Sequence, residues 1–175
     1  MNKKQPFIIQ VIGYKNSGKT TLICDLIEKS KELGLNSATI KHHGHGGKPD
    51  VKENTDSFLH KKAGSVMAGV EGHGELLLSI TQSNWQLRDI LRFYELLDID
   101  VIFVEGYKQE DFPKIVLLSK EDDFPILSEV SNICAVITSF GSKIEDTHYP
   151  SFSRNEQSLI DKWFHDFLLS NIGKK

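Results

Sequence analysis

The sequence predicts an α/β fold: a three-layer sandwich with a mostly parallel sheet and a β-hairpin extension. Short apolar runs alternate along the chain with segments whose apolar residues repeat at helical spacing. The first apolar run stops at a glycine that opens a tight turn into a helix. The 175 residues, 39% hydrophobic and 26% charged, suit one globular unit with a full core. We therefore expect residues 1–175 to form a single domain.

Composition excludes several classes of protein. Lysine and arginine number 21 against 24 acidic residues, so the chain lacks the basic surface that binding to a nucleic acid requires. Cys24 and Cys134 are far apart and form no CxxC pair, which suits a reducing compartment. The first apolar run is too short for a signal sequence or a membrane span. We expect a cytoplasmic protein that binds neither nucleic acid nor membrane.

The first third of the chain predicts a strand, a helix and a second strand. Residues 7–12 are almost wholly apolar and rich in isoleucine and valine, as in a buried central strand. Apolar residues over 19–33 lie on one helical face, and Gly34 follows where a helix commonly ends. Residues 37–40 predict the next strand.

The middle of the chain predicts a loop, a short helix and a hairpin. Residues 42–54 contain glycine, proline and histidine without an apolar period, which indicates a loop. Residues 56–63 predict a short helix. Strands are expected over 65–70 and 75–80, joined by a turn over 71–74. Because a hairpin is antiparallel, we expect a mixed sheet.

A helix is predicted to follow the hairpin. Ser83 and Gln86 fit a capping box, in which each side chain satisfies a free amide of the first turn. The helix would run to about Leu97. Its core-facing residues would be Ile90, Leu91, Tyr94 and Leu97.

Three more strands and a final helix complete the prediction. The strands cover 101–104, 114–118 and 135–138, all apolar runs. Ser153 and Glu156 form a second capping box before the last helix. Core spacing in that helix is shown by Leu159, Ile160, Trp163, Phe164, Phe167 and Leu168.

The turn after the first strand carries the strongest functional signal. Residues 13–20 read GYKNSGKT and match G-x-x-x-x-G-K-[ST] at every fixed position. Gly13 and Gly18 allow the backbone amides to turn inward around an anion, and the following helix directs its positive end there. Lys19 would reach the β- and γ-phosphates, and Thr20 would bind Mg²⁺. The sequence therefore predicts a P-loop NTPase-like domain that binds a nucleoside triphosphate.

A P-loop needs a second acid near the metal, and the sequence offers two. Glu105 follows the apolar run 101–104, where aspartate is more usual, so it would bind Mg²⁺ directly, through water, or orient a catalytic water. Gly106 then lets the backbone approach the γ-phosphate. Asp56 is a further candidate ligand, although an acid at a helix start is also favoured by the helix dipole.

Two other segments are open to several interpretations. His42, His43 and His45 follow Lys41 and would ligate Zn²⁺ or Ni²⁺, contact nucleotide or substrate, or lie exposed without a role. Residues 119–122 (SKED) loosely match the guanine-reading [NT]KxD motif, but an ordinary turn after a strand is the better explanation of them. These motifs do not choose between guanine and adenine.

Four blocks in register resemble the molybdopterin-guanine dinucleotide biosynthesis protein B family, MobB. The resemblance covers residues 8 to 140. The blocks are GYKNSGKTT at 13–21, TIKHHGH at 39–45, Asp56-Ser57 with His60 and Ala63-Gly64, and VEGYK at 104–108.

The resemblance implies a GTP-binding adapter, usually a homodimer, with weak Mg²⁺-dependent GTPase activity at most. It would act beside the guanylyltransferase MobA, which joins GMP to molybdopterin. Thr20 and Glu105 would hold Mg²⁺. The phosphates would be held by Asn16, Ser17, Gly18, Lys19, Thr20 and Thr21, and the nucleotide or partner side would be edged by Lys41, His42, His43, Gly106, Tyr107 and Lys108.

Two alternatives share the P-loop. A metal-delivery GTPase of the nickel-chaperone type would use the histidines, but that wider group has its lysine directly after the first glycine, where this chain has Tyr14. Lys15 comes one residue later, so we do not expect it to reach across a dimer. A small-molecule kinase needs arginines around the transferred phosphoryl group, and the chain has only Arg88, Arg92 and Arg154.

Overall fold

The computed structural model describes residues 5–43, 55–141, 144 and 148–172. Six strands form one sheet in the order β2-β5-β1-β6-β7-β8, and every neighbouring pair is parallel. Among the described residues, no helix combines the length and apolar character needed to cross a bilayer. The strands are β1 (Phe7–Ile12), β2 (Ser37–Lys41), β5 (Val101–Glu105), β6 (Lys114–Leu118), β7 (Ile133–Thr138) and β8 (Ser151–Ser153).

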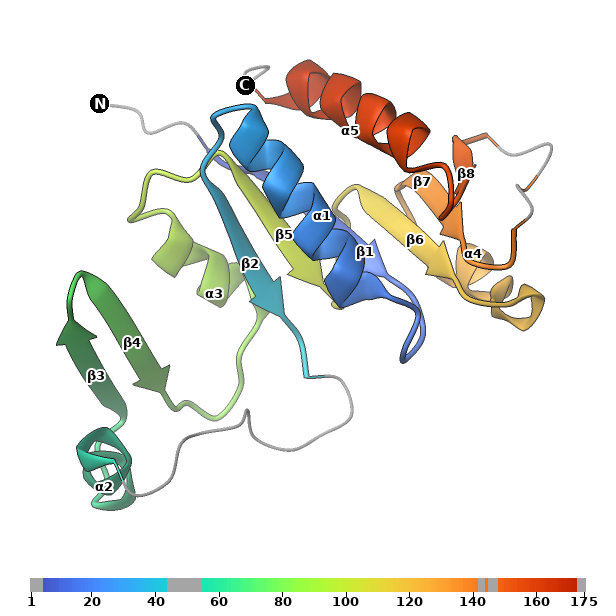
Figure 1. The fold of residues 1–175 in the computed structure, drawn as a ribbon. Coiled ribbons are helices and arrows are strands. Elements are labelled where there is room, and N and C mark those ends of the chain that lie inside the picture. The colour runs from blue at the N-terminus through green and yellow to red at the C-terminus, as the bar shows by residue number, and fades with distance from the viewer. Residues whose placement is uncertain (1–4, 44–54, 142–143, 145–147, 173–175) are drawn as a thin grey trace.

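Helices cover both faces of this sheet (Figure 1). Helices α1 (Lys19–Glu32) and α5 (Gln157–Asn171) pack on one face, while α3 (Leu87–Tyr94) and the short α4 (Ile126–Glu129) pack on the other. A parallel sheet buried on both faces needs strands that are apolar throughout, as β1, β5 and β6 nearly are. The predicted three-layer α/β sandwich is confirmed.

Strand β1 shows how the core is divided. Ile9 and Val11 pack against α1 and α5, in a cluster that includes Leu22 and Phe164. Ile12 points to the opposite face and joins the cluster under α4. Because successive side chains alternate between faces, one apolar strand supplies two cores and fixes the point at which the following turn emerges.

The predicted hairpin forms, but it is not part of the main sheet. Strands β3 (Met67–Gly72) and β4 (Glu75–Ile80) pair only with each other, beside helix α2 (Asp56–Lys62). The expected mixed sheet is therefore wrong. The two turn residues, His73 and Gly74 in left-handed conformations, specify the pairing of the adjacent strands. They do not specify whether the pair joins a third strand.

The capping box at Ser83 does not form. Helix α3 begins at Leu87, with Gln86 in an extended conformation at the N-cap and without a capping side-chain bond. A four-residue pattern does not reveal which residue is the last extended one before a helix. Leu91 is buried as predicted, but Leu97 lies beyond the end of the helix and is exposed.

The last helix is close to its prediction. Helix α5 begins at Gln157, and the Glu156 carboxylate accepts a hydrogen bond from the Ser153 amide at 2.9 Å, which is half of the predicted box. Leu159 is exposed rather than core-facing, while the other apolar residues predicted for the core are buried or pack against it. Strand β8 (Ser151–Ser153) was not predicted because only one of its three residues is apolar.

Candidate nucleotide-binding site

The P-loop joins β1 to α1 at the carboxyl edge of the sheet. A Cβ on Gly13 would lie 2.6 Å from Ser17 Oγ and 2.8 Å from the carbonyl oxygen of Leu117, so only glycine fits. Gly18 has φ 84° at the start of the helix, a conformation that glycine adopts without strain. Asn16 is also left-handed, with φ 62°. The buried Ser17 hydroxyl has no hydrogen-bond partner among the described residues, so it is available to a phosphate oxygen.

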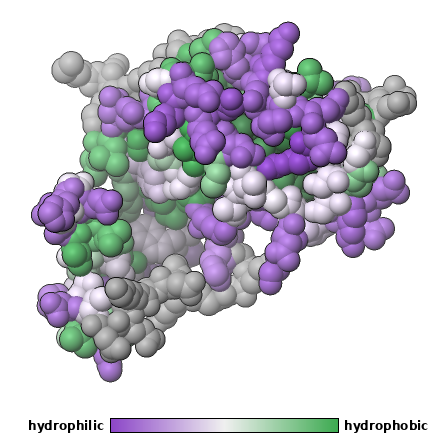
Figure 2. Space-filling view, viewed as in Figure 1, coloured by the Kyte–Doolittle hydropathy of each residue, from purple (hydrophilic) through white to green (hydrophobic). Residues whose placement is uncertain are grey.

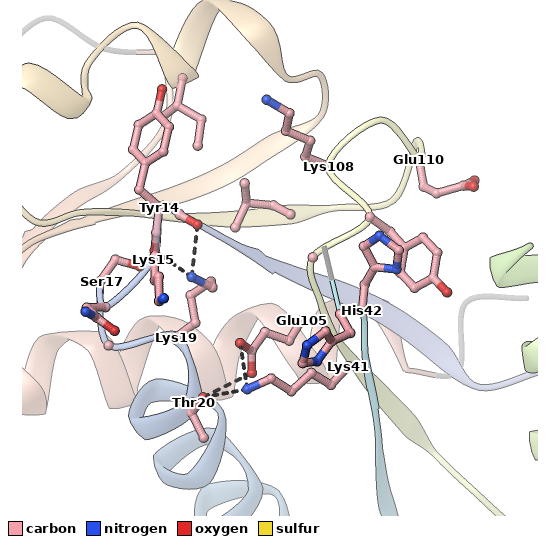
Figure 3. Close-up of a pocket in the computed structure, with 18 of the residues that line it drawn as sticks. Tyr14, Lys15, Ser17, Lys19, Thr20, Lys41, His42, Glu105, Lys108 and Glu110 are labelled. Carbon is pink, nitrogen blue, oxygen red and sulfur yellow. Dashed lines mark hydrogen bonds and ion pairs between the residues drawn. The ribbon is translucent and has the colours of Figure 1, made fainter. Parts of the chain in front are cut away.

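Lys19 folds over this loop. Its Nζ donates to the carbonyl oxygens of Gly13 at 3.0 Å and Tyr14 at 2.6 Å (Figure 3). Burial lowers the pKa of Lys19 from its ordinary value, and the positive charge of Lys41 lowers it further, while Glu105 acts in the opposite direction. A partly buried ammonium beside the P-loop favours an anionic partner. A bound phosphate would accept the hydrogen bonds that Lys19 now donates to the two carbonyl oxygens.

Thr20 and Glu105, the two predicted Mg²⁺ ligands, lie side by side. The Thr20 hydroxyl donates to Glu105 Oε2 at 3.1 Å. Lys41 Nζ lies 3.2 Å from Glu105 Oε1 and 3.4 Å from Thr20 Oγ1, because Lys41 and Glu105 are register partners on β2 and β5. One cation thus already bridges both oxygens. A hydroxyl and a carboxylate with room for phosphate oxygens are ligands that Mg²⁺ accepts.

The chain turns sharply after Glu105. Gly106 and Tyr107 both have positive φ, 94° and 55°. Gln10 in β1 donates hydrogen bonds from Nε2 to the carbonyl oxygens of Gly106 at 3.0 Å and Tyr107 at 2.7 Å. The Tyr107 ring packs on His42 with centroids 4.4 Å apart, and burial raises the pKa of its phenol. Tyr107 and His42 thus line the cavity as a contacting pair.

A buried lysine supports the same loop further along. Lys114 is 0% exposed and donates to the carbonyl oxygens of Glu110 at 2.5 Å and Phe112 at 3.0 Å. Burial lowers the pKa of Lys114. Lys114 is the register partner of Gln10. Two polar residues in otherwise apolar strands therefore donate hydrogen bonds to the loop that follows β5. Sequence reasoning missed both, although a glutamine and a lysine in such runs were the visible signal.

These elements enclose a cavity of about 1030 Å³. Thirteen predicted site residues line it: Gly13, Asn16, Ser17, Gly18, Lys19, Thr20, Lys41, His42, His43, Glu105, Gly106, Tyr107 and Lys108. Six further lining residues had not been assigned to the site: Ile12, Tyr14, Lys15, Gln109, Glu110 and Ile126. The structure therefore joins the predicted P-loop, acid and flanking segments into one site.

Two predicted residues lie apart from this cavity. Thr21 is exposed on α1 and is not among the described lining residues. Asp56 is the first residue of α2, next to the hairpin, and does not line the cavity either. The N-cap Thr55 there accepts a hydrogen bond from the Phe58 amide at 3.3 Å. The position of Asp56 fits an acid favoured by the helix dipole.

The weak guanine-reading match belongs to an ordinary turn. Asp122 is exposed, pairs with Lys120 at 3.4 Å and does not line the cavity. The next residue, Asp123, is buried and accepts hydrogen bonds from the amides of Ser119 at 2.7 Å and Lys120 at 3.2 Å. The acidic cluster thus shapes the exit from β6.

The histidines are only partly described. His42 and His43 line the cavity, and His45 lies outside the described residues. Within the part of the chain that the structure describes, no three histidine, cysteine, aspartate or glutamate side chains gather as a metal site.

Comparison with known proteins identifies relatives over nearly the whole length. The chain is 36% identical over 170 residues to a probable molybdopterin-guanine dinucleotide biosynthesis adapter protein of Bacillus subtilis, covering 96% of this chain and 95% of that protein. It is 31% identical to the Haemophilus influenzae adapter protein, covering 95% and 94% of the two chains.

Solved structures agree. The crystal structure of Bacillus subtilis MobB superposes with a TM-score of 0.80 at 35% identity, covering 96% of this chain and 99% of that one. A MobB homologue from Bacillus stearothermophilus gives a TM-score of 0.76 at 33% identity, covering 94% and 99%. The family model described as molybdopterin guanine dinucleotide synthesis protein B matches residues 8–139. Together with the P-loop and the acid on β5, these matches show that the chain belongs to the MobB family.

Proposed function

We propose that this chain is a GTP-binding adapter in molybdopterin-guanine dinucleotide synthesis. It would hold Mg²⁺ and GTP while a partner guanylyltransferase joins GMP to molybdopterin. The observation that carries the proposal is the assembly of Lys19, Thr20 and Glu105 around one cavity at the carboxyl edge of the sheet. Its relatives, which are named as adapter proteins, support the role.

Each residue has a defined part in this proposal. The P-loop amides and Lys19 bind the β- and γ-phosphates, and Thr20 with Glu105 holds Mg²⁺. The metal, when bound, neutralises phosphate charge. We also assign to Glu105 the role of orienting a hydrolytic water. None of the described cavity residues is an arginine, the side chain that accelerates phosphoryl transfer in fast GTPases, so we expect slow turnover.

The family supports the adapter role rather than metal delivery. The relatives that cover most of the chain are named for molybdopterin-guanine dinucleotide synthesis. We also propose a cytoplasmic location. Both cysteines are free thiols, and burial raises the pKa of Cys134 to about 12.

Titration calorimetry with GTP and ATP in the presence of Mg²⁺ tests the nucleotide site. We expect tighter binding of GTP. Lys19→Ala should weaken it about 10- to 150-fold, because a hydrogen bond to a charged group contributes about 1.5–3 kcal/mol. Lys120→Ala is the matched control, since that lysine is exposed and outside the cavity. Equal GTP affinity in Lys19→Ala and the parent would show that the site is assigned wrongly.

We further propose that the hairpin forms a homodimer interface. Six large apolar side chains in the hairpin or directly before it are 45% to 72% exposed: Val66, Met67, Val70, Leu76, Leu77 and Leu78. Figure 2 shows hydrophobic side chains on this projecting part of the molecule. Apolar surface of this extent marks an interaction site, and each strand of a two-stranded sheet also has an unpaired edge.

The guanylyltransferase partnership has a direct test. A MobA-like enzyme and molybdopterin are incubated with GTP, alone or with this chain, and dinucleotide formation is followed. We expect the parent chain to increase the rate and Lys19→Ala to lose the effect. An increase that does not depend on Lys19 would separate the partner role from nucleotide binding.

A further inference from the structure

The cavity continues beyond the part that a nucleotide's phosphates would occupy. Lys19, which should bind the β- and γ-phosphates, contacts the Gly13 and Tyr14 end of the P-loop. Past this end, Tyr14 and Lys15 lie on one side and Lys108 and Glu110 on the other (Figure 3). A volume of about 1030 Å³ is at the top of the range of about 300–1,000 Å³ for small-molecule pockets.

The lining of this outer end is apolar below and charged at the rim. Ile12 and Ile126 contribute apolar side chains. Tyr14 is 43% exposed and offers a free aromatic surface. Tyr107 is a second aromatic residue of the lining, and its ring packs against His42. A lining that combines aromatic and aliphatic side chains favours a flat ring system.

The charged groups define the rest of the ligand. Lys108 pairs with Glu129 at 2.8 Å and also interacts electrostatically with Tyr14. Lys15 makes no ion pair with any described residue. Two lysines at the rim suit a phosphate, and the Glu110 carboxylate can accept hydrogen bonds from ring N–H groups.

We propose that this outer end binds a phosphorylated pterin at the same time as the nucleotide occupies the P-loop. The inference rests on the proposed function, since molybdopterin is the other half of the dinucleotide. Tyr14 and Tyr107 would contact the ring, while Lys15 and Lys108 would bind the anionic group. The adapter would then bring both reactants to its partner enzyme.

The test measures quenching of the fluorescent pterin-6-carboxylate, an anionic pterin, by the chain alone and by the chain loaded with Mg²⁺ and a non-hydrolysable GTP analogue. We expect saturable binding in both forms and no competition between pterin and nucleotide. Tyr14→Ala and Lys108→Gln should each weaken pterin binding tenfold or more. GTP affinity is measured separately for each variant, so that loss of the outer end alone is distinguished from loss of the whole cavity.

Lys120→Gln is the control, because Lys120 is likewise an exposed lysine in an ion pair but lies outside the cavity. Unchanged pterin binding in Lys108→Gln, or equal loss in both lysine variants, overturns the proposal. So does competition with GTP, which would place the pterin on the P-loop.

If GTP binds and pterin does not, this inference fails and the adapter function stands. If pterin binds and GTP does not, the proposed nucleotide function fails. A change in oligomeric state with Tyr14→Ala, without pterin binding, would assign the outer end to a second copy of the chain.

Discussion

At the scale of the residue, charge balance at Glu105 is the feature that most affects function. Its carboxylate is largely buried, with 12% of the side chain exposed, and it pairs with Lys41, which is 60% exposed. The pairing follows from register, since the two residues face each other at the ends of β2 and β5. Mg²⁺ would have to displace the Lys41 ammonium in order to bind both Thr20 and Glu105.

Lys41→Met should therefore ease metal binding. We expect the Mg²⁺ concentration that half-saturates GTP binding to fall about two- to fivefold, because an ion pair that is open to solvent on its lysine side contributes about 0.2–1 kcal/mol. Lys15→Met is the control, a cavity lysine without an ion pair among the described residues. A higher Mg²⁺ requirement in Lys41→Met would mean that Lys41 helps to bind the phosphates instead.

Lys114 gives a pH-dependent contribution to stability whose sign can be worked out. Its pKa is lowered in the folded chain relative to the ordinary value of 10.5, chiefly by burial. Between the lowered value and about 10.5 the unfolded chain binds more protons, so stability rises with pH through this window. In Lys114→Met this increase should be absent. Urea unfolding from pH 7 to 10.5 measures the difference, and parallel pH profiles of the two proteins would contradict it.

At the scale of the element, apolar runs were the most reliable guide. Strands β1, β5 and β6 are buried on both faces, so their runs are continuous and their limits are clear. The P-loop and Glu105 were predictable because a fixed motif and a strand end place them. The loop after β5 was predicted only in part, since Gln10 and Lys114 reach it from strands remote in sequence.

Helix starts and short strands were less predictable for a physical reason. Gln86 rather than Ser83 is the N-cap of α3. Which residue caps the helix depends on the path of the chain before it. Strand β8 is specified by its pairing with β7 and not by an apolar pattern in its own three residues. The placement of Asp56 likewise depends on where the hairpin lies, which no local pattern specifies.

The turn after β6 offers a test at this scale. Asp123→Ala removes the acceptor of two backbone amides and should lower the free energy of unfolding by about 1–3 kcal/mol. Asp122→Ala should change it by less than about 0.5 kcal/mol, because that side chain is exposed. Thermal and urea unfolding measure both. Asp122→Ala should also leave GTP affinity intact, and a large loss there would restore the guanine-reading interpretation.

At the scale of the whole molecule, two parts differ in how they are covered. The six-stranded sheet is buried between helices, whereas the hairpin and α2 project beyond the β2 edge (Figure 1). Leu76 and Leu77 side chains are 60% and 70% exposed although they are adjacent and point to opposite faces. A second copy of the chain that covers one or both faces would bury them.

Leu77→Glu should shift the proposed dimer towards monomer. A buried charge without a partner is strongly unfavourable, so we expect at least a tenfold weaker association. Leu169→Glu is the matched control, since Leu169 is 57% exposed on α5, away from the hairpin. Sedimentation equilibrium measures both proteins. Unchanged association in Leu77→Glu would remove the hairpin as the interface.

The separate pairing of β3 with β4 also bears on how the molecule fluctuates. The two strands form ladder hydrogen bonds only with each other. Separating them therefore breaks none of the strand pairings of the six-stranded sheet. Local unfolding follows units of this kind. Amide protons of the hairpin should therefore exchange with solvent deuterium well before those of β1 and β5, and partner association should slow that exchange selectively.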